Sequence, residues 1–97
     1  MFVGTLELDV LLGDTRSLKQ KRAVVRPVLA DLRRRYDVAV AEVGHQDLHR
    51  RALLGVAVVS GEAAHCVEVL DSCERHVAGL PELELLSAHR TVRDSDD

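Results

Sequence analysis

The 97-residue chain has a mass of 10.7 kDa and is 46% apolar and 30% charged, which fits one globular domain and excludes a two-domain or disordered protein. One Phe, one Tyr and no Trp exclude the stacking platforms and aromatic cages on which many small binding modules depend. The net charge of −3 argues against strong sequence-independent binding of nucleic acid, because that affinity grows with the number of phosphates neutralised.

The first two elements are a strand and a long helix. Residues 2–12 alternate between two faces, as a strand with one buried side does. A helix follows, because residues 17–20 have the form of a capping box and apolar residues recur at helical spacing up to Tyr36. We expect a kink or a break at Pro27, since a proline inside a helix removes a hydrogen bond and clashes with the preceding turn.

The rest of the chain reads as a strand, a polar connection, a strand, a helix and a last strand. In this order they are residues 37–44, 45–50, 51–60, about 61–78 and about 82–92. The third strand is nearly all apolar, which predicts a central strand covered on both faces. Gly79 and Pro81 end the second helix. The domain therefore comprises residues 1–92, and we expect the acidic tail, residues 93–97, to be disordered.

The order β-α-β-β-α-β predicts a ferredoxin-like α+β sandwich. Right-handed crossovers place both helices on one face of a four-stranded antiparallel sheet. The opposite face would carry Val3, Thr5, Glu7, Ala39, Ala41 and Val43. Because a sheet face of small apolar residues is seldom left wetted, we expect a homo-oligomer that associates through it. The alternative is that this face is rich in Ala and Val but solvated.

The positive charge is concentrated in the first helix. Between residues 16 and 35 there are eight basic residues and one acid, so this segment carries +7 and the remainder of the chain carries −10. Lys19, Arg22, Arg26 and Arg33 fall within one angular sector of the outer surface. Such a segment indicates a negatively charged partner, with the solvated face of an ordinary helix as the alternative.

The candidate nucleic-acid-binding residues follow from this segment. Lys and Arg side chains along a helix pair with phosphates, and the arginine fork adds bidentate geometry. The predicted residues are Arg16, Lys19, Lys21, Arg22, Arg26, Arg50 and Arg51, the last two if the fold brings the 45–50 connection near the helix. The open sheet face offers Glu7 and Asp9 where an RNA recognition motif has aromatics, so contact with RNA would use phosphate and shape.

Metal binding and catalysis find little support in the spacing of the reactive residues. Cys73 and His76 share one helix face, but Cys66 and Cys73 are ~10 Å apart along the helix, too far for a common ion or an undistorted disulfide. No nucleophile elbow and no phosphate-cradling glycine loop is present in the sequence. Glu7 and Asp9 are neighbours on a strand face, which favours a solvated surface over a carboxylate pair. We expect no metal, no cofactor and no enzymatic activity.

The N-terminus and the cysteine content predict a cytoplasmic protein. Residues 1–4 lack the basic region of a secretory signal, and acidic Glu7 and Asp9 interrupt the apolar residues that follow. No apolar run approaches the ~20 residues that a membrane span needs. Two cysteines do not make the dense disulfide framework of a small secreted domain.

Several segments carry a family resemblance. They are Met1-Phe2-Val3-Gly4-Thr5-Leu6, Ser17-Leu18-Lys19-Gln20-Lys21-Arg22, Ala41-Glu42-Val43, Asp47-Leu48 and Leu54-Gly55-Val56-Ala57. They resemble the bacterial YlxP-like family, a small family of unknown function whose most specific element is the S-L-K-x-K-R string. The resemblance implies a ferredoxin-like fold and a cytoplasmic bacterial protein. Genes of this family commonly lie among those for transcription elongation, translation initiation and ribosome maturation, which implies a role with RNA or the ribosome.

Three functional hypotheses result. The first is an accessory RNA- or ribosome-associated protein whose partner is ribosomal RNA or the ribosome itself. The second is a homo-oligomeric scaffold that contacts another protein through the open sheet face. The third is a protein that holds an acidic ligand with the same cations. No membrane partner and no small-molecule substrate is indicated.

Overall fold

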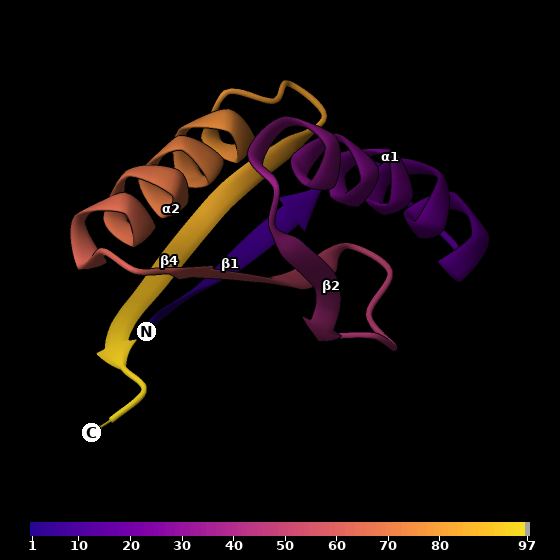
Figure 1. Ribbon diagram of the computed structural model, residues 1–97. Helices are drawn as coiled ribbons and strands as arrows, with labels where there is room; N and C mark the ends of the chain where they lie inside the picture. Colours follow the sequence, from indigo (N-terminus) through magenta and orange to yellow (C-terminus); the bar gives the residue numbers. More distant parts are fainter. Residues whose placement is uncertain (97) are drawn as a thin grey trace.

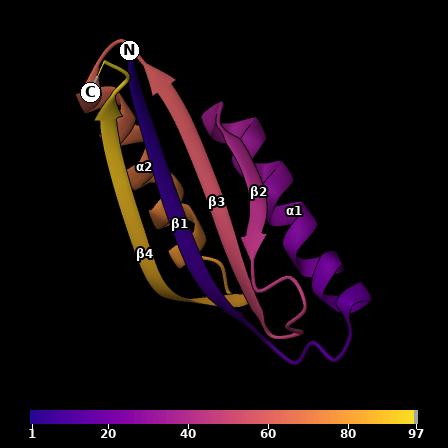
Figure 2. The same ribbon diagram turned by 90° about the horizontal axis from the view of Figure 1, so that it is seen from below.

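The computed structural model describes residues 1–96. It contains a four-stranded antiparallel sheet that two helices cover on one face (Figure 1). The elements are β1 (Phe2–Leu12), α1 (Leu18–Tyr36), β2 (Ala39–Gly44), β3 (Arg51–Ser60), α2 (Ala63–Ala78) and β4 (Leu83–Asp94). The strands lie in the order β2-β3-β1-β4, with both helices behind the sheet when it is viewed from its open side (Figure 2). This confirms the predicted ferredoxin-like α+β fold.

The pairing of β1 with β3 shows how the two faces of the sheet differ. Leu6 lies opposite Val56, and both are buried beneath the helices. Glu7 lies opposite Gly55 on the other face, where β1 leaves Glu7 exposed. Along β3 buried residues alternate with half-buried ones, so within one chain the helices cover only one face of this strand. The second cover that its apolar sequence predicts is not provided by any element of the chain within residues 1–96.

Each helix contributes a narrow stripe to the core. From α1 the buried apolar residues are Val25, Val28 and Leu32, and from α2 they are Cys66, Leu70, Cys73 and Val77. Both thiols are free and fully buried. Burial raises the pKa of the Cys73 thiol to about 11, so that it stays protonated at neutral pH and acts as a small apolar side chain.

The start of α1 follows the predicted capping box closely. The Ser17 hydroxyl accepts a hydrogen bond from the Gln20 backbone N–H at 3.1 Å. The Gln20 side chain reaches back one residue further than expected and accepts from the Arg16 N–H at 2.6 Å. Two backbone donors at the helix N-terminus are thereby satisfied.

Of the kink or break expected at Pro27, the break does not occur, because α1 is a single helix from Leu18 to Tyr36. Pro27 and Ala23 are both exposed on the outer side of this helix. The hydrogen bond that proline removes is the one to the Ala23 carbonyl, which water can reach on this side. Packing of the inner face therefore holds the helix together across the proline.

The two chain ends lie at the same end of the sheet (Figure 2). Strand β4 continues to Asp94, which pairs with Phe2, and the Ser95 N–H donates to the Met1 carbonyl at 2.7 Å. The predicted tail, residues 93–97, therefore begins inside the sheet, and Asp97 lies outside the described residues. Within residues 1–96, no helix has the length and apolar character needed to cross a membrane.

Candidate nucleic-acid interface

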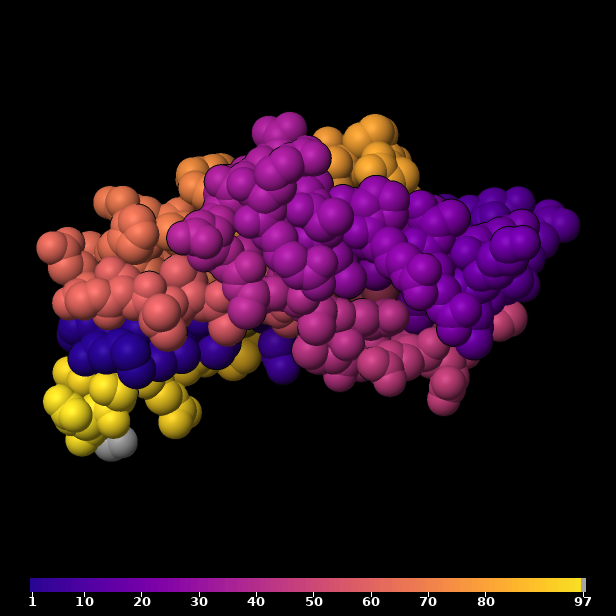
Figure 3. All heavy atoms as spheres, turned by 45° about the vertical axis from the view of Figure 1, so that its right-hand side comes forward, coloured from indigo at the N-terminus to yellow at the C-terminus, as the bar shows by residue number. Residues whose placement is uncertain are grey.

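The outer face of α1 carries three cations on a common surface. Lys19, Arg22 and Arg26 are exposed and line a shallow hollow of about 410 Å³ together with Ala23 and Pro27. Within residues 1–96, no carboxylate oxygen lies within 4.0 Å of the charged nitrogens of these three side chains. Figure 3 shows this helix as a raised violet surface on the side of the molecule. The predicted angular sector is thus confirmed for these three residues.

Lys21 belongs to the interior of the protein. Its side chain is only 3% exposed, and its ammonium nitrogen lies 2.7 Å from Glu42 Oε2. The same nitrogen donates a hydrogen bond to the His45 carbonyl at 2.7 Å. The prediction that Lys21 contacts a phosphate is therefore wrong, because its charge is already neutralised between α1 and the end of β2.

A signal for this placement was present in the sequence. Residue 21 falls three positions after Leu18 and four before Val25, which is the spacing of one helix face. On a helix with 100° per residue, Lys19 and Lys21 point about 200° apart. A lysine within an apolar stripe needs a buried partner, and Glu42 is that partner.

Arg16 and Arg50 lie at the N-terminal end of α1. Arg16 pairs with Asp14 at 3.3 Å, and both side chains are 79% exposed, so this pair is weak. Arg50 donates hydrogen bonds to the Gly13 carbonyl at 2.9 Å and the Leu12 carbonyl at 3.4 Å. The fold thus brings the 45–50 connection to the start of α1, as the prediction for Arg50 required.

Arg51 faces the opposite side of the protein. Its guanidinium holds Asp9 through two hydrogen bonds, at 3.1 Å from Nε and 2.6 Å to Oδ2. His45 Nε2 lies 3.5 Å from the same carboxylate. The Arg51 hydrogen bond, above all, lowers the pKa of Asp9 below its usual value, against the opposing effect of desolvation. The prediction that Arg51 extends the α1 surface is therefore wrong, and Asp9, which was expected on a solvated strand face, pairs with it.

The second half of α1 has its charges occupied as well. Arg33 donates to the Val40 carbonyl at 2.8 Å, which turns it toward β2 and away from the predicted sector. Arg34 and Arg35 pair with Asp31 at 2.5 and 3.1 Å. The Arg35 hydrogen bond is the main reason that the pKa of Asp31 is lowered, and His76 also lies 2.7 Å from this carboxylate. Within residues 1–96, the cations of the +7 segment that have neither an ion pair nor a hydrogen bond to the protein are therefore Lys19, Arg22 and Arg26.

The arrangement suits the binding of anions better than catalysis. Lys19 and Arg26 are separated by ~10 Å along the helix axis, so the three charges form a short line. Among the residues that the structure describes, no group of three His, Cys, Asp or Glu side chains is placed to hold a metal ion. A line of cations matches several negative groups in succession.

Two comparisons with known proteins agree with each other. Residues 3–90 match the model of a family described as "Protein of unknown function (DUF503)". The chain is also similar to the "Uncharacterized protein YlxP" of Bacillus subtilis (strain 168), with 30% identity over 82 residues. The aligned region covers 84% of this chain and 89% of that relative. Neither description gives an activity, so a function has to be inferred from the charged and apolar surfaces of the chain.

Proposed function

The chain belongs to the YlxP-like DUF503 family, and we propose that it is a non-enzymatic accessory protein that binds the phosphate backbone of ribosomal RNA through the outer face of α1. The observation that carries this proposal is the unpaired group Lys19, Arg22 and Arg26. These exposed cations make one surface locally positive, although the chain as a whole has a net charge of −3. The proposal includes a cytoplasmic site of action, where ribosomal RNA is found.

The number of free cations sets the expected strength of binding. Each phosphate neutralised contributes about −0.7 to −0.9 to the slope of log K against log salt, so three contacts give a slope of about −2 to −3. Arg50 adds up to one further contact at the N-terminal end of the helix. This predicts an association that is modest in isolation and sensitive to salt, as suits a protein that assists a larger ribonucleoprotein.

The shape of the group favours a polyanion over a single small anion. A phosphate or carboxylate ion needs converging donors, whereas Lys19, Arg22 and Arg26 are spread along the helix. The single Phe and Tyr leave little for base stacking, so the contact is to backbone and shape and independent of sequence.

The direct test is a titration with ribosomal RNA fragments over a range of salt concentrations. The wild-type protein is expected to show the slope of about −2 to −3, and Lys19→Glu/Arg22→Glu to bind at least tenfold more weakly with a shallower slope. Absence of a salt slope, or unchanged binding by this variant, would refute the proposal.

A matched pair of single variants separates a local surface from the effect of net charge. Arg22→Glu and Arg75→Glu change the charge equally, and both arginines are exposed on helices and without an ion pair within residues 1–96. We expect Arg22→Glu to weaken binding about tenfold and Arg75→Glu to weaken it less than twofold. Equal losses would show that only the overall charge matters.

A further inference from the structure

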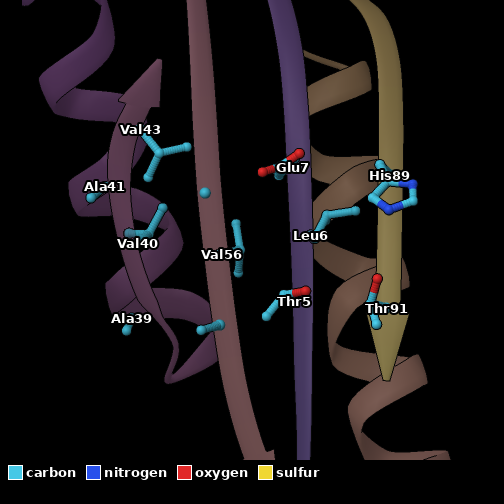
Figure 4. Close-up of a pocket in the computed structure, with 12 residues that line it drawn as sticks. Thr5, Leu6, Glu7, Ala39, Val40, Ala41, Val43, Val56, His89 and Thr91 are labelled. Atoms are coloured by element: carbon cyan, nitrogen blue, oxygen red, sulfur yellow. The ribbon is translucent and has the colours of Figure 1, made fainter. Parts of the chain in front are cut away.

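The open face of the sheet holds a trough of about 670 Å³ (Figure 4). Its floor consists of small residues on β2 and β3: Ala39, Ala41, Gly55 and Ala57. Val43 forms one wall, and Glu7 and His89, which are directly opposite each other on β1 and β4, form the other. The trough lies on the far side of the sheet from α1 and α2.

Two exposed valines lie on the same face of the sheet as this trough. Val43 is 52% exposed and Val59 is 62% exposed, and both belong to the open face. Val43 leans across Gly55, where an added Cβ would come within 2.8 Å of Val43 Cγ1. Exposed apolar residues on a sheet face that no helix covers are typical of a site of association.

We propose that this face binds the same face of a second copy of the chain and forms a two-fold symmetric homodimer. An interface between identical faces has to be complementary to itself, so any charge it carries needs a group of the opposite sign on the same face. The open face carries both signs, with carboxylates at Glu7, Asp9 and Glu84 and guanidinium groups at Arg51 and Arg93, and Asp9 and Arg51 already pair within each chain. A face with one sign of charge would repel its own copy.

The shape and the size of the face support the same partner. Val59 is 62% exposed, while the trough beside it is lined by the small side chains of Ala39, Ala41 and Ala57, so one face offers both a projecting side chain and a hollow to receive it. The four strands have 11, 6, 10 and 12 residues, which cover roughly 600 Å² of the sheet plane. The accessible area of a corrugated face exceeds its outline, which brings it near the ~800 Å² per partner of a standard interface.

This proposal is independent of RNA binding by α1. In such a dimer the sheets are central and the helices are outside, so that each copy keeps Lys19, Arg22 and Arg26 on its outer surface. A variant that separates the two copies therefore leaves the cations in place. Failure of dimerisation and failure of RNA binding can be observed separately.

Sedimentation velocity over increasing concentration tests the dimer directly. The wild-type protein is expected to reach twice the 10.7 kDa of one chain. Ala41→Asp places a charge on the trough floor in both copies and is expected to weaken dimerisation at least 100-fold. Ala64→Asp, on the exposed side of α2, is the matched control and is expected to dimerise as the wild type does.

A second variant and a second readout guard against a folding defect. Val59→Lys changes a side chain that is already 62% exposed and is expected to weaken the dimer as well, with an unchanged circular dichroism spectrum. In the wild type, dilution should shift the NMR methyl signals of Ala41, Val43 and Val59 and leave that of Ala64 unchanged.

Three results would overturn the proposal. One is a single-chain mass up to about 1 mM, a concentration that reveals even a millimolar dissociation constant. Another is growth beyond two copies, because an interface between identical faces closes at the dimer. The last is Ala41→Asp and Ala64→Asp associating equally, which would place the contact elsewhere on the molecule.

Discussion

Lys19 and Lys21 stand two residues apart in one sequence motif, and the fold gives them opposite surroundings. Lys19 lies on the outer face of α1, exposed beside Arg22. Lys21 lies on the inner face, 3% exposed and held between Glu42 and the His45 carbonyl. The difference shows that the summed charge of a sequence segment does not predict the charge that the folded segment exposes to solvent. A helix distributes consecutive residues between core and solvent, and only the outer cations are available to a partner.

The largest expected effect comes from removing the inner lysine. Lys21→Met leaves the Glu42 carboxylate without its cation and the His45 carbonyl without its donor. We expect the free energy of unfolding to fall by roughly 3 kcal/mol, measured by urea denaturation. Lys19→Met is expected to change it by less than about 0.5 kcal/mol. Equal losses for the two variants would contradict the distinction between the faces.

A double variant checks the cause of that loss. Replacing both partners, as Lys21→Met/Glu42→Leu, removes the unpaired carboxylate together with the cation. We expect most of the lost stability to return, because an apolar pair of similar size replaces a buried ion pair at little cost. If the double variant is as unstable as Lys21→Met, the unpaired carboxylate is not the cause.

An intermediate loss of stability is expected at Arg51, the other cation whose predicted role in binding was wrong. Arg51→Ala removes both hydrogen bonds to Asp9 and is expected to lower the free energy of unfolding by about 1 kcal/mol at neutral pH, a value reduced for the partial exposure of the pair. The pKa of Asp9 should rise toward its usual value, which an NMR titration of the carboxyl group measures.

The pH dependence of this effect has a definite sign. Because the folded pKa of Asp9 is lowered, its ion pair stabilises the fold above the unfolded carboxyl pKa of about 4 and loses that contribution as the pH falls through the folded value. The gap in stability between wild type and Arg51→Ala should therefore narrow below about pH 4. A gap that stays constant from neutral to acidic pH would show that the ion pair is not its source.

The smallest effect is expected at the exposed pair of Arg16 and Asp14. Both side chains are 79% exposed, so Arg16→Ala should change the free energy of unfolding by less than about 0.5 kcal/mol. Its effect on RNA affinity should also be smaller than that of Arg22→Ala, since Asp14 already neutralises Arg16. Calorimetric unfolding and one RNA titration of each variant measure both differences. A larger loss of RNA affinity for Arg16→Ala would move the binding surface to the β1–α1 turn.

The sequence was sufficient for most of the architecture. Alternation over residues 2–12, the capping box at Ser17 and the stop at Gly79 are local signals, and each corresponds to an element in the structure. Of the kink or break expected at Pro27, the break was wrong, because a local rule about proline was outweighed by burial of Val25, Val28 and Leu32 on the inner face. Local rules hold where tertiary packing does not oppose them.

The candidate site was less predictable, since it depends on contacts between distant residues. Glu42 is 21 positions from Lys21, and Asp9 is 42 positions from Arg51, so neither pairing is visible in a local pattern. The apolar spacing around Lys21 was the one usable signal. What the sequence did indicate correctly was the sector of Lys19, Arg22 and Arg26, because it follows from helix geometry alone.

The most direct test of the account is an NMR titration of the labelled protein with a short RNA at low salt. Binding to the outer face of α1 predicts that the largest shifts of backbone signals fall on residues 19–27, and that they decrease as salt is added. Lys21 should keep the exchange protection of a buried residue throughout. Shifts centred on Thr5, Ala41 and His89 of the open sheet face, or no shifts even at low salt, would contradict it.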